Sequence, residues 1–444
     1  MTIGKLGKSL FTCALVVGAL LVAGASAESK ARIVRLSNVE GTVQMNRGNG
    51  FEKAFLNLPI VEGSKIKTGT DGRAEVEFED GTILHLVTNT EMAFPRLSLG
   101  DDGQKLSTVE LKDGRLYVNA RPKKGDQLTV NFARESVTLA DAAHLRIDLE
   151  DAEATVAVMQ GDVTVTGPSG KVELAKKRSA TFDLANNDSY EIAKNYEDEA
   201  SDQWDKQQTE YHDRYASNKT YDASSPYSYG TSDLNYYGSY SNIPGYGWGW
   251  QPFFMGAGWS PYQDGAWAWY PGFGYMWVSA YPWGWMPYYY GSWQFAPGYG
   301  WFWSPGYWNT WYPQPRVVNP PKRTPVPQPP TRTGQTVMVG KGLTSFSANG
   351  APRRITINPG SAGLGIPRGS VRNLDRTAQE SLKREGPVVV RTVRPAPANP
   401  PVRTWGSSGS SGGSSSASGP SSTAPRPSAP PARMPSSGHS TKPH

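Results

Sequence analysis

One aromatic phrase occurs three times between residues 238 and 303, and this repetition constrains the fold more than any other feature. Each copy opens with Gly, a small residue and an aromatic residue, and closes with Pro-Gly-aromatic-Gly before a last pair of rings. The copies end at Trp250, Trp277 and Trp303, which are 27 and 26 residues apart. A fixed period of this kind indicates one repeated supersecondary unit, and each copy needs its neighbours to bury an apolar face.

Each copy predicts a β-hairpin. Pro fixes φ at the second position of a type II turn, and the following Gly supplies the positive φ that the third position requires. On both sides of the turn, aromatic residues alternate with small ones, so the rings of one strand share a face. The phrase therefore predicts three hairpins within a domain of residues 233–312.

The rings of these hairpins are the candidate contact residues, and two interpretations of them stay open. Exposed rings would stack on sugar faces or on a partner protein, whereas inward-facing rings would form the core of a domain that has few aliphatic residues. The ten candidate ligand-binding side chains are Trp248, Trp250, Trp267, Trp269, Tyr275, Trp277, Trp283, Trp285, Trp301 and Trp303.

Residues 30–190 predict an all-β domain. Apolar and polar residues alternate strictly in 74–78 and 145–149, as in strands with one buried face. Asp-Gly pairs at 71–72 and 80–81 are typical of the turns that separate short strands. The fold class predicted for the chain is therefore all-β, with one linking helix.

Four segments of this domain also carry a family resemblance: residues 39–43, 61–69, 73–84 and 156–165. Together they resemble the periplasmic FecR domain, the β-rich part of iron-dicitrate sensor regulators. The resemblance implies a β-roll or solenoid-like domain with an interaction role. In the signalling members, a cytoplasmic anti-sigma domain and a membrane helix come first. We expect only a signal peptide here, so the sigma-regulating role is not carried over.

Three phrases of the aromatic block carry a second resemblance: residues 233–240, 259–267 and 281–293. They are similar to the uncharacterised Trp/Tyr/Gly-rich domain that follows FecR domains in some exported bacterial proteins. This resemblance implies an architecture and no activity.

Residues 1–27 predict a signal peptide. Lys5 and Lys8 precede an apolar run, and small residues at 25–27 fit a cleavage site. The alternative is an uncleaved N-terminal anchor. The only cysteine, Cys13, lies inside this segment, so the mature chain would have no disulfide and no thiolate ligand. We expect an exported protein of the periplasm or cell surface, without an integral membrane span after cleavage.

Two further segments flank the aromatic block. Residues 195–217 predict an amphipathic helix whose aromatic stripe docks on a neighbouring domain. Residues 313–444, rich in Pro, Ser and Gly, predict a disordered tail with 18 Lys and Arg against three acidic residues. The exception is Leu374–Arg384, which predicts a short amphipathic helix. That net charge of +15 leaves −11 on residues 28–312 once the two lysines of the signal are counted. The tail is therefore expected to contact anionic surface polymers and not nucleic acid.

No catalytic, metal-binding or cofactor-binding residues are predicted. His85 and His144 fall in strands, His212 is placed on the solvated side of the helix, and no zinc, phosphate-loop or nucleophile motif occurs. We expect a non-catalytic envelope scaffold whose aromatic repeats contact polysaccharide or a partner protein. The alternative is a FecR-like signalling and partner-docking component of the periplasm.

Overall fold

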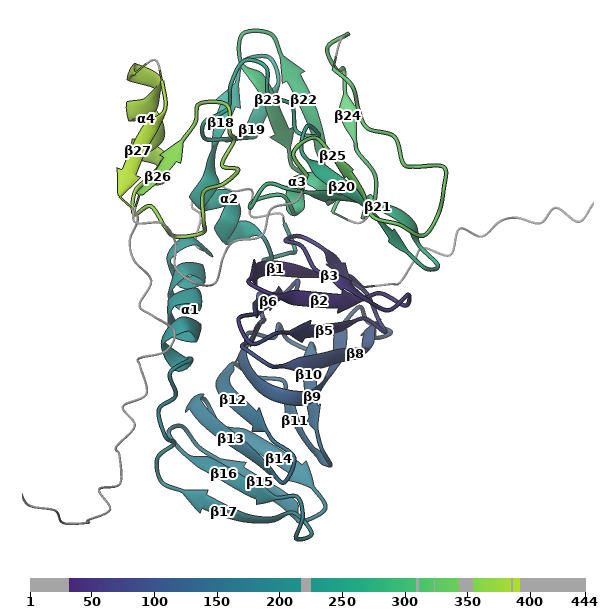
Figure 1. The fold of residues 1–444 in the computed structure, drawn as a ribbon, viewed down its shortest axis with the longest axis vertical. Coiled ribbons are helices and arrows are strands. Elements are labelled where there is room, and N and C mark those ends of the chain that lie inside the picture. The colour runs from purple at the N-terminus through teal and green to yellow at the C-terminus, as the bar shows by residue number, and fades with distance from the viewer. Residues whose placement is uncertain are drawn as a thin grey trace, which may run out of the picture. The chain divides into compact units, whose positions relative to one another are not determined.

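The computed structural model describes residues 32–216, 225–308, 311–322, 324–342, 354–384 and 386–391. The predicted signal peptide and the last part of the predicted tail lie outside these residues. No helix within the described residues has the length and apolar character needed to cross a membrane. The all-β prediction is confirmed, because strands supply most of the described secondary structure (Figure 1).

The N-terminal β-domain is built from short strands separated by turns. They are β1 Val34–Glu40, β2 Val43–Asn46, β3 Phe51–Lys53, β4 Pro59–Ile60, β5 Lys65–Thr68, β6 Arg73–Glu77, β7 Ile83–Leu86, β8 Glu91–Leu99, β9 Lys105–Ala120, β10 Gln127–Phe132, β11 Glu135–Leu139, β12 Ala143–Leu149, β13 Glu153–Gln160, β14 Val163–Gly167, β15 Gly170–Leu174, β16 Ser179–Asp183 and β17 Ser189–Ala193.

Strand β9 connects the two layers of this domain. Its first half pairs with β8 and, in parallel, with β10, whereas its second half pairs with β7 and β12. The change of partners occurs at Gly114, where φ is 86° and an added Cβ would lie 2.4 Å from the Asn89 carbonyl oxygen. Only glycine fits this bend without strain. Val, Leu and Ile side chains from both layers fill one apolar core.

The described helices are α1 Asp202–Ala216, α2 Thr231–Tyr237, α3 Met286–Tyr289 and α4 Leu374–Lys383. Helix α1 is shorter than the predicted 195–217. Its start is displaced because Arg146 donates to the Glu197 carbonyl oxygen at 3.0 Å and to the Asp202 carboxylate, which fixes the chain before the first turn. Trp204 of the aromatic stripe packs against Val87 of the β-domain, as expected.

The three predicted hairpins are present: β18 Gly238–Ile243 with β19 Gly247–Pro252, β20 Gly265–Tyr270 with β21 Gly274–Ser279, and β22 Ser292–Ala296 with β23 Gly300–Ser304. Each turn is closed as a type II turn should be. For example, the Tyr246 amide donates to the Ile243 carbonyl oxygen at 2.9 Å, and Gly245 between them has a φ of 81°.

The first and last residues of each phrase are packed together. A Cβ added to Gly238 would lie 2.3 Å from the Trp250 indole, and one added to Gly265 would lie 2.5 Å from that of Trp277. The third copy brings Gly291 and Trp303 together in the same way. The closing indole therefore occupies the space that a side chain at the opening glycine would fill, which explains why the two residues recur together.

Part of the predicted tail is ordered. The described residues after 312 form β24 Val317–Val318, β25 Val337–Val339, β26 Arg354–Ile357, helix α4 and β27 Val388–Arg391. Strand β24 extends the β22 edge, and β25 extends the β20 edge. For the described residues of this segment other than α4, which matches the short helix expected from Leu374, these strands differ from the predicted disorder. The average composition of the segment hid short apolar sets, such as Ile355 and Ile357, which are buried.

Candidate binding site

The structure places most of the ten candidate rings in the core. Trp248 is 59% exposed and Trp269 is partly buried. The other eight are buried: Trp250, Trp267, Tyr275, Trp277, Trp283, Trp285, Trp301 and Trp303. Because the domain has few aliphatic residues, its indoles fill the interior, and of these eight rings only Trp301 lines the cleft described below. These eight residues support the domain and do not form an open platform.

A different set of rings is exposed, one at the tip of each hairpin. Tyr246, Phe273 and Tyr299 each follow the Pro-Gly pair of their turn, and their exposed fractions are 45%, 41% and 48%. The sequence interpretation concentrated on tryptophans and missed these side chains. Their signal was available, because the last position of a tight turn points away from the paired strands.

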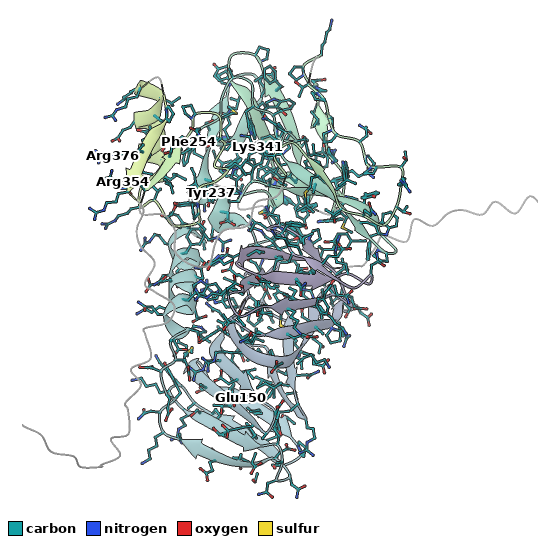
Figure 2. The ribbon with its side chains drawn as sticks, viewed as in Figure 1. Glu150, Tyr237, Phe254, Lys341, Arg354 and Arg376 are labelled. Carbon is teal, nitrogen blue, oxygen red and sulfur yellow. The ribbon has the colours of Figure 1, made fainter. Side chains whose placement is uncertain are left out.

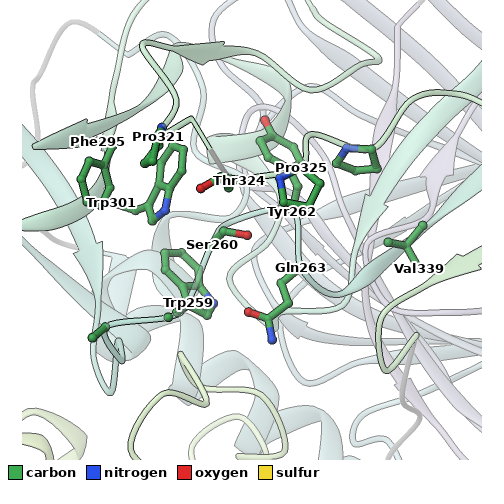
Figure 3. Close-up of a pocket in the computed structure, with 13 residues that line it drawn as sticks. Trp259, Ser260, Tyr262, Gln263, Phe295, Trp301, Pro321, Thr324, Pro325 and Val339 are labelled. Atoms are coloured by element: carbon green, nitrogen blue, oxygen red, sulfur yellow. The ribbon is translucent and has the colours of Figure 1, made fainter.

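The aromatic domain also contains a cleft of about 470 Å³ (Figure 3). Phe295 and Trp301 lie on one side of it, and Tyr262 and Pro325 lie on the other (Figure 3). The remaining lining residues are Ala257, Gly258, Trp259, Ser260, Gln263, Pro321, Thr324, Pro327 and Val339. The cleft therefore combines the third hairpin, the connector after the first hairpin and a proline-rich segment that was expected to be disordered.

No charged side chain lines this cleft. Its polar side chains are those of Ser260, Gln263 and Thr324, together with Tyr262. Burial raises the pKa of Tyr262 and outweighs the opposite effect of the hydrogen bond that its hydroxyl oxygen accepts from the Arg316 amide at 3.1 Å, so this phenol stays neutral. Such a lining can hold a neutral apolar or ring-containing group, and it offers no pair of carboxylates or imidazoles for proton transfer.

A second cluster consists of charged side chains of both signs and lies around Glu75 of strand β6. The Glu75 carboxylate is inaccessible and has four partners. Arg368 and Ser37 each donate to Oε1 at 2.6 Å, His212 approaches Oε1 at 2.9 Å, and His85 approaches Oε2 at 3.1 Å. Burial would raise the pKa of Glu75, but the charges of Arg368 and His212 outweigh burial and hold it well below its ordinary value.

The same network extends through Asp233 of helix α2. Arg368 donates two hydrogen bonds to the Asp233 carboxylate, at 3.0 and 2.9 Å. Arg35 of strand β1 lies 2.7 Å from Asp233 and 3.1 Å from Glu77. Arg35, Glu77 and Asp233 are buried, and the Arg368 side chain is 9% exposed. The network therefore joins the β-domain to helix α2 and to the loop that carries Arg368.

His85 links this network to helix α1. Its Nδ1 lies 2.7 Å from the Asp205 carboxylate, whose other oxygen lies 2.9 Å from His144. Burial would lower the pKa of His85, but its bonds to Asp205 and Glu75 outweigh burial and raise it to about 9. Burial would raise the pKa of Asp205, but the two histidines lower it to about 2. The pair is therefore ionised at neutral pH.

The histidines thus differ from their sequence-based placement. His212 is 3% exposed and lies against Glu75, so its prediction as a solvated residue was wrong. No local sequence pattern indicates this cluster, because Glu75 and Arg368 are 293 residues apart. Among the described residues, no group of three or more His, Cys, Asp or Glu side chains is arranged to hold a metal ion. We call the network of Glu75, Glu77, Asp233, Arg35 and Arg368 the ionic junction.

Comparison with known families assigns the two folded regions. Residues 64–164 match the family model described as FecR protein. The chain contains a FecR-like domain. Residues 231–321 match a second model, described as a family of unknown function, DUF6600. Both resemblances found in the sequence are confirmed, and the aromatic hairpins fall in the second domain.

Two solved structures match part of the chain. Two crystal structures of a provisionally assigned anti-sigma factor from Parabacteroides distasonis ATCC 8503, at 1.65 and 2.50 Å resolution, match with identities of 22% and 21%. Each match has a TM-score of 0.28 and covers 32% of this chain and 63% of the other, so just under two-thirds of that protein is spanned. No curated protein sequence matches the chain.

Proposed function

We propose that this protein is a non-catalytic envelope component that docks a partner protein, and that the cleft of the aromatic domain receives an uncharged segment of that partner. The FecR-like domain supports a protein partner, because the family's regulators act through protein contacts. The signal-like segment 1–27 supports export to the periplasm or cell surface.

The uncharged cleft is the observation that carries this proposal. Between residues 238 and 308 the only charged residue is Asp264, which is buried. A groove lined by Trp301, Phe295 and prolines is suited to an extended, proline- or ring-containing segment, because rings and prolines pack against such a chain without ordering many rotamers. A charged ligand would lose its hydration there without gaining an ionic partner.

The ionic junction supports a structural role for the rest of the molecule. It holds Arg368 against the buried side chains of Arg35, Glu75 and Asp233. A junction of this kind fixes the FecR-like domain, helix α2 and the Arg368 loop as one unit.

Site-specific photo-crosslinking tests the proposal. A photoreactive phenylalanine at position 295, at the cleft, is expected to give protein adducts in cells that express the full chain. The same group at Tyr190, which is 41% exposed on β17, is the matched control and should not give these adducts. Absence of protein adducts at 295, or identical adducts at both positions, would contradict docking at the cleft.

A neutral polysaccharide is the second candidate ligand of the same cleft. Ser260, Gln263 and Thr324 place hydroxyl and amide groups beside the rings, as a site for sugar hydroxyls requires. A glycan array with the purified chain and a Phe295→Ser variant separates the candidates. Glycan binding that the variant loses, without protein adducts in cells, would favour the polysaccharide.

A further inference from the structure

Residues 354–391 form a basic module with one buried and one exposed face. In the ribbon of β26 and β27, Ile355, Ile357 and Val388 are buried, and the two isoleucines belong to the same apolar core as Leu374 of helix α4. The other face of the ribbon carries Arg354 and Arg391, both exposed. The module is therefore held to the protein through its apolar face, and its cationic face is open to solvent.

The exposed face brings like charges together. Arg354 and Arg391 are directly opposite each other in the antiparallel register. Like charges in such a pair are destabilising. Within the described residues, neither guanidinium forms an ion pair. A site that holds two unneutralised guanidinium groups side by side is suited to an anion, above all to phosphate.

Other exposed cations lie on helix α4 and beside its two ends. Arg372, Arg376, Lys383 and Arg384 are exposed, and the acidic residues within the described part of the module are Asp375 and Glu380. Arg376 is paired with Glu380 at 3.0 Å. Figure 2 shows the labelled Arg354 and Arg376 directed away from the protein on the same side of the view. The module thus presents an extended cationic surface.

Two large apolar side chains are exposed among these cations. Leu382 is 83% exposed and immediately precedes Lys383 and Arg384, and Val389 is 61% exposed, two residues before Arg391. A soluble polyanion gains nothing from such side chains. A membrane surface does, because apolar groups enter the boundary between headgroups and acyl chains while flanking cations meet the phosphates.

We propose that the 354–391 module binds the surface of a membrane that contains anionic phospholipid. Leu382 and Val389 enter the headgroup layer, and Arg354, Arg391, Lys383 and Arg384 contact lipid phosphates. This surface is separate from the cleft and goes beyond partner docking. The sequence predicted that the basic tail contacts anionic polymers, and this proposal names phospholipid as the anionic ligand.

Vesicle co-sedimentation of the full chain tests this surface. Vesicles of phosphatidylglycerol and phosphatidylcholine should bind the chain, whereas pure phosphatidylcholine vesicles should bind it far more weakly. Each charge near such a surface contributes a roughly fivefold gain in affinity, so R354Q/R391Q should weaken binding about 25-fold. The matched control, K53Q/K65Q, removes two exposed charges from the FecR-like domain and should bind as the parent does.

A Leu382→Ser variant distinguishes lipid from a soluble polyanion. If Leu382 enters the headgroup layer, this variant should bind vesicles several-fold more weakly at both low and high salt. Its thermal unfolding profile should be unchanged. Full retention of vesicle binding by Leu382→Ser would overturn the lipid proposal and assign the surface to a soluble anionic polymer. Equal binding to both kinds of vesicle, or an equal loss in R354Q/R391Q and K53Q/K65Q, would overturn it too. None of these outcomes bears on crosslinking at Phe295.

Discussion

The FecR-like domain and the aromatic hairpins are both built from antiparallel strands, but different side chains fill their cores. In the first, Val, Leu and Ile of two layers interlock. In the second, each closing indole occupies the space above an opening glycine, as Trp277 does above Gly265. The difference shows that a small strand domain can be specified by a few repeated ring-to-backbone contacts in place of a broad aliphatic interior.

The aromatic core also has a polar requirement that the aliphatic core lacks. An indole N–H needs an acceptor when it is buried. Trp250 donates to the Leu234 carbonyl oxygen at 3.0 Å, and Trp283 donates to that of Ala362 at 2.7 Å. The Trp277 N–H is buried without a hydrogen-bond partner. The repeats are therefore packed alike, but they differ in whether the indole N–H of the closing tryptophan has a hydrogen-bond acceptor.

Removal of the Glu75 carboxylate should have the largest effect, because it leaves the ionic junction between the two regions unbalanced. We expect Glu75→Ala to lower the free energy of unfolding by about 3–5 kcal/mol, since Arg368 and His85 would remain buried without their partner. Urea unfolding measures this change. Glu110→Ala, at a partly exposed surface pair with Lys112, is the control and should cost under about 1 kcal/mol. Similar losses of unfolding free energy in the two variants would show that the ionic junction does not stabilise the fold more than a surface ion pair does.

Alkaline pH should weaken the same junction without a mutation. The pKa of His85, about 9, lies above its ordinary value of 6.5, so its contribution is complete below pH 6.5 and is lost as the pH rises through 9. The free energy of unfolding should fall by about 3 kcal/mol over this window. Urea unfolding at several pH values measures it. In a His85→Gln variant this window should become flat, and an unchanged slope would contradict the assignment.

A methyl group on an opening glycine should test the ring-over-glycine packing. Gly265→Ala places a Cβ against the Trp277 indole, so we expect a loss of about 1–3 kcal/mol. Gly258→Ala is the matched control, because no atom lies within 4 Å of an added Cβ there. Differential scanning calorimetry compares the two variants. Equal melting temperatures would show that the hairpins do not depend on this contact.

The smallest effect should separate packing from hydrogen bonding within the repeats. Trp250→Phe and Trp277→Phe remove the same atoms from equivalent, fully buried positions. Only the first also removes a hydrogen bond, so it should cost about 1 kcal/mol more. Urea unfolding of both variants measures the difference. A greater loss for Trp277→Phe would reverse the comparison.

The sequence predicted what depends on local pattern. The Pro-Gly turns and the alternation around them were enough to predict all three hairpins, and the four FecR-like segments were enough to predict the β-domain. Contacts between residues that are far apart in the sequence could not be predicted from it. Nothing near Glu75 indicates Arg368, and nothing in the aromatic phrase shows that Trp301 lines a cleft whereas Tyr299 is exposed. Burial of the rings was an open alternative, and the structure decides it for eight of the ten.

The position of Arg368 has a consequence for the order of assembly. Its partner Glu75 is synthesised 293 residues earlier, so for most of translation that carboxylate waits without the cation that neutralises it. Contacts of such long sequence separation form late, after local hairpins. A chain truncated before residue 368 should therefore form the strands of the β-domain and lack the ion pair that joins Arg368 to Glu75.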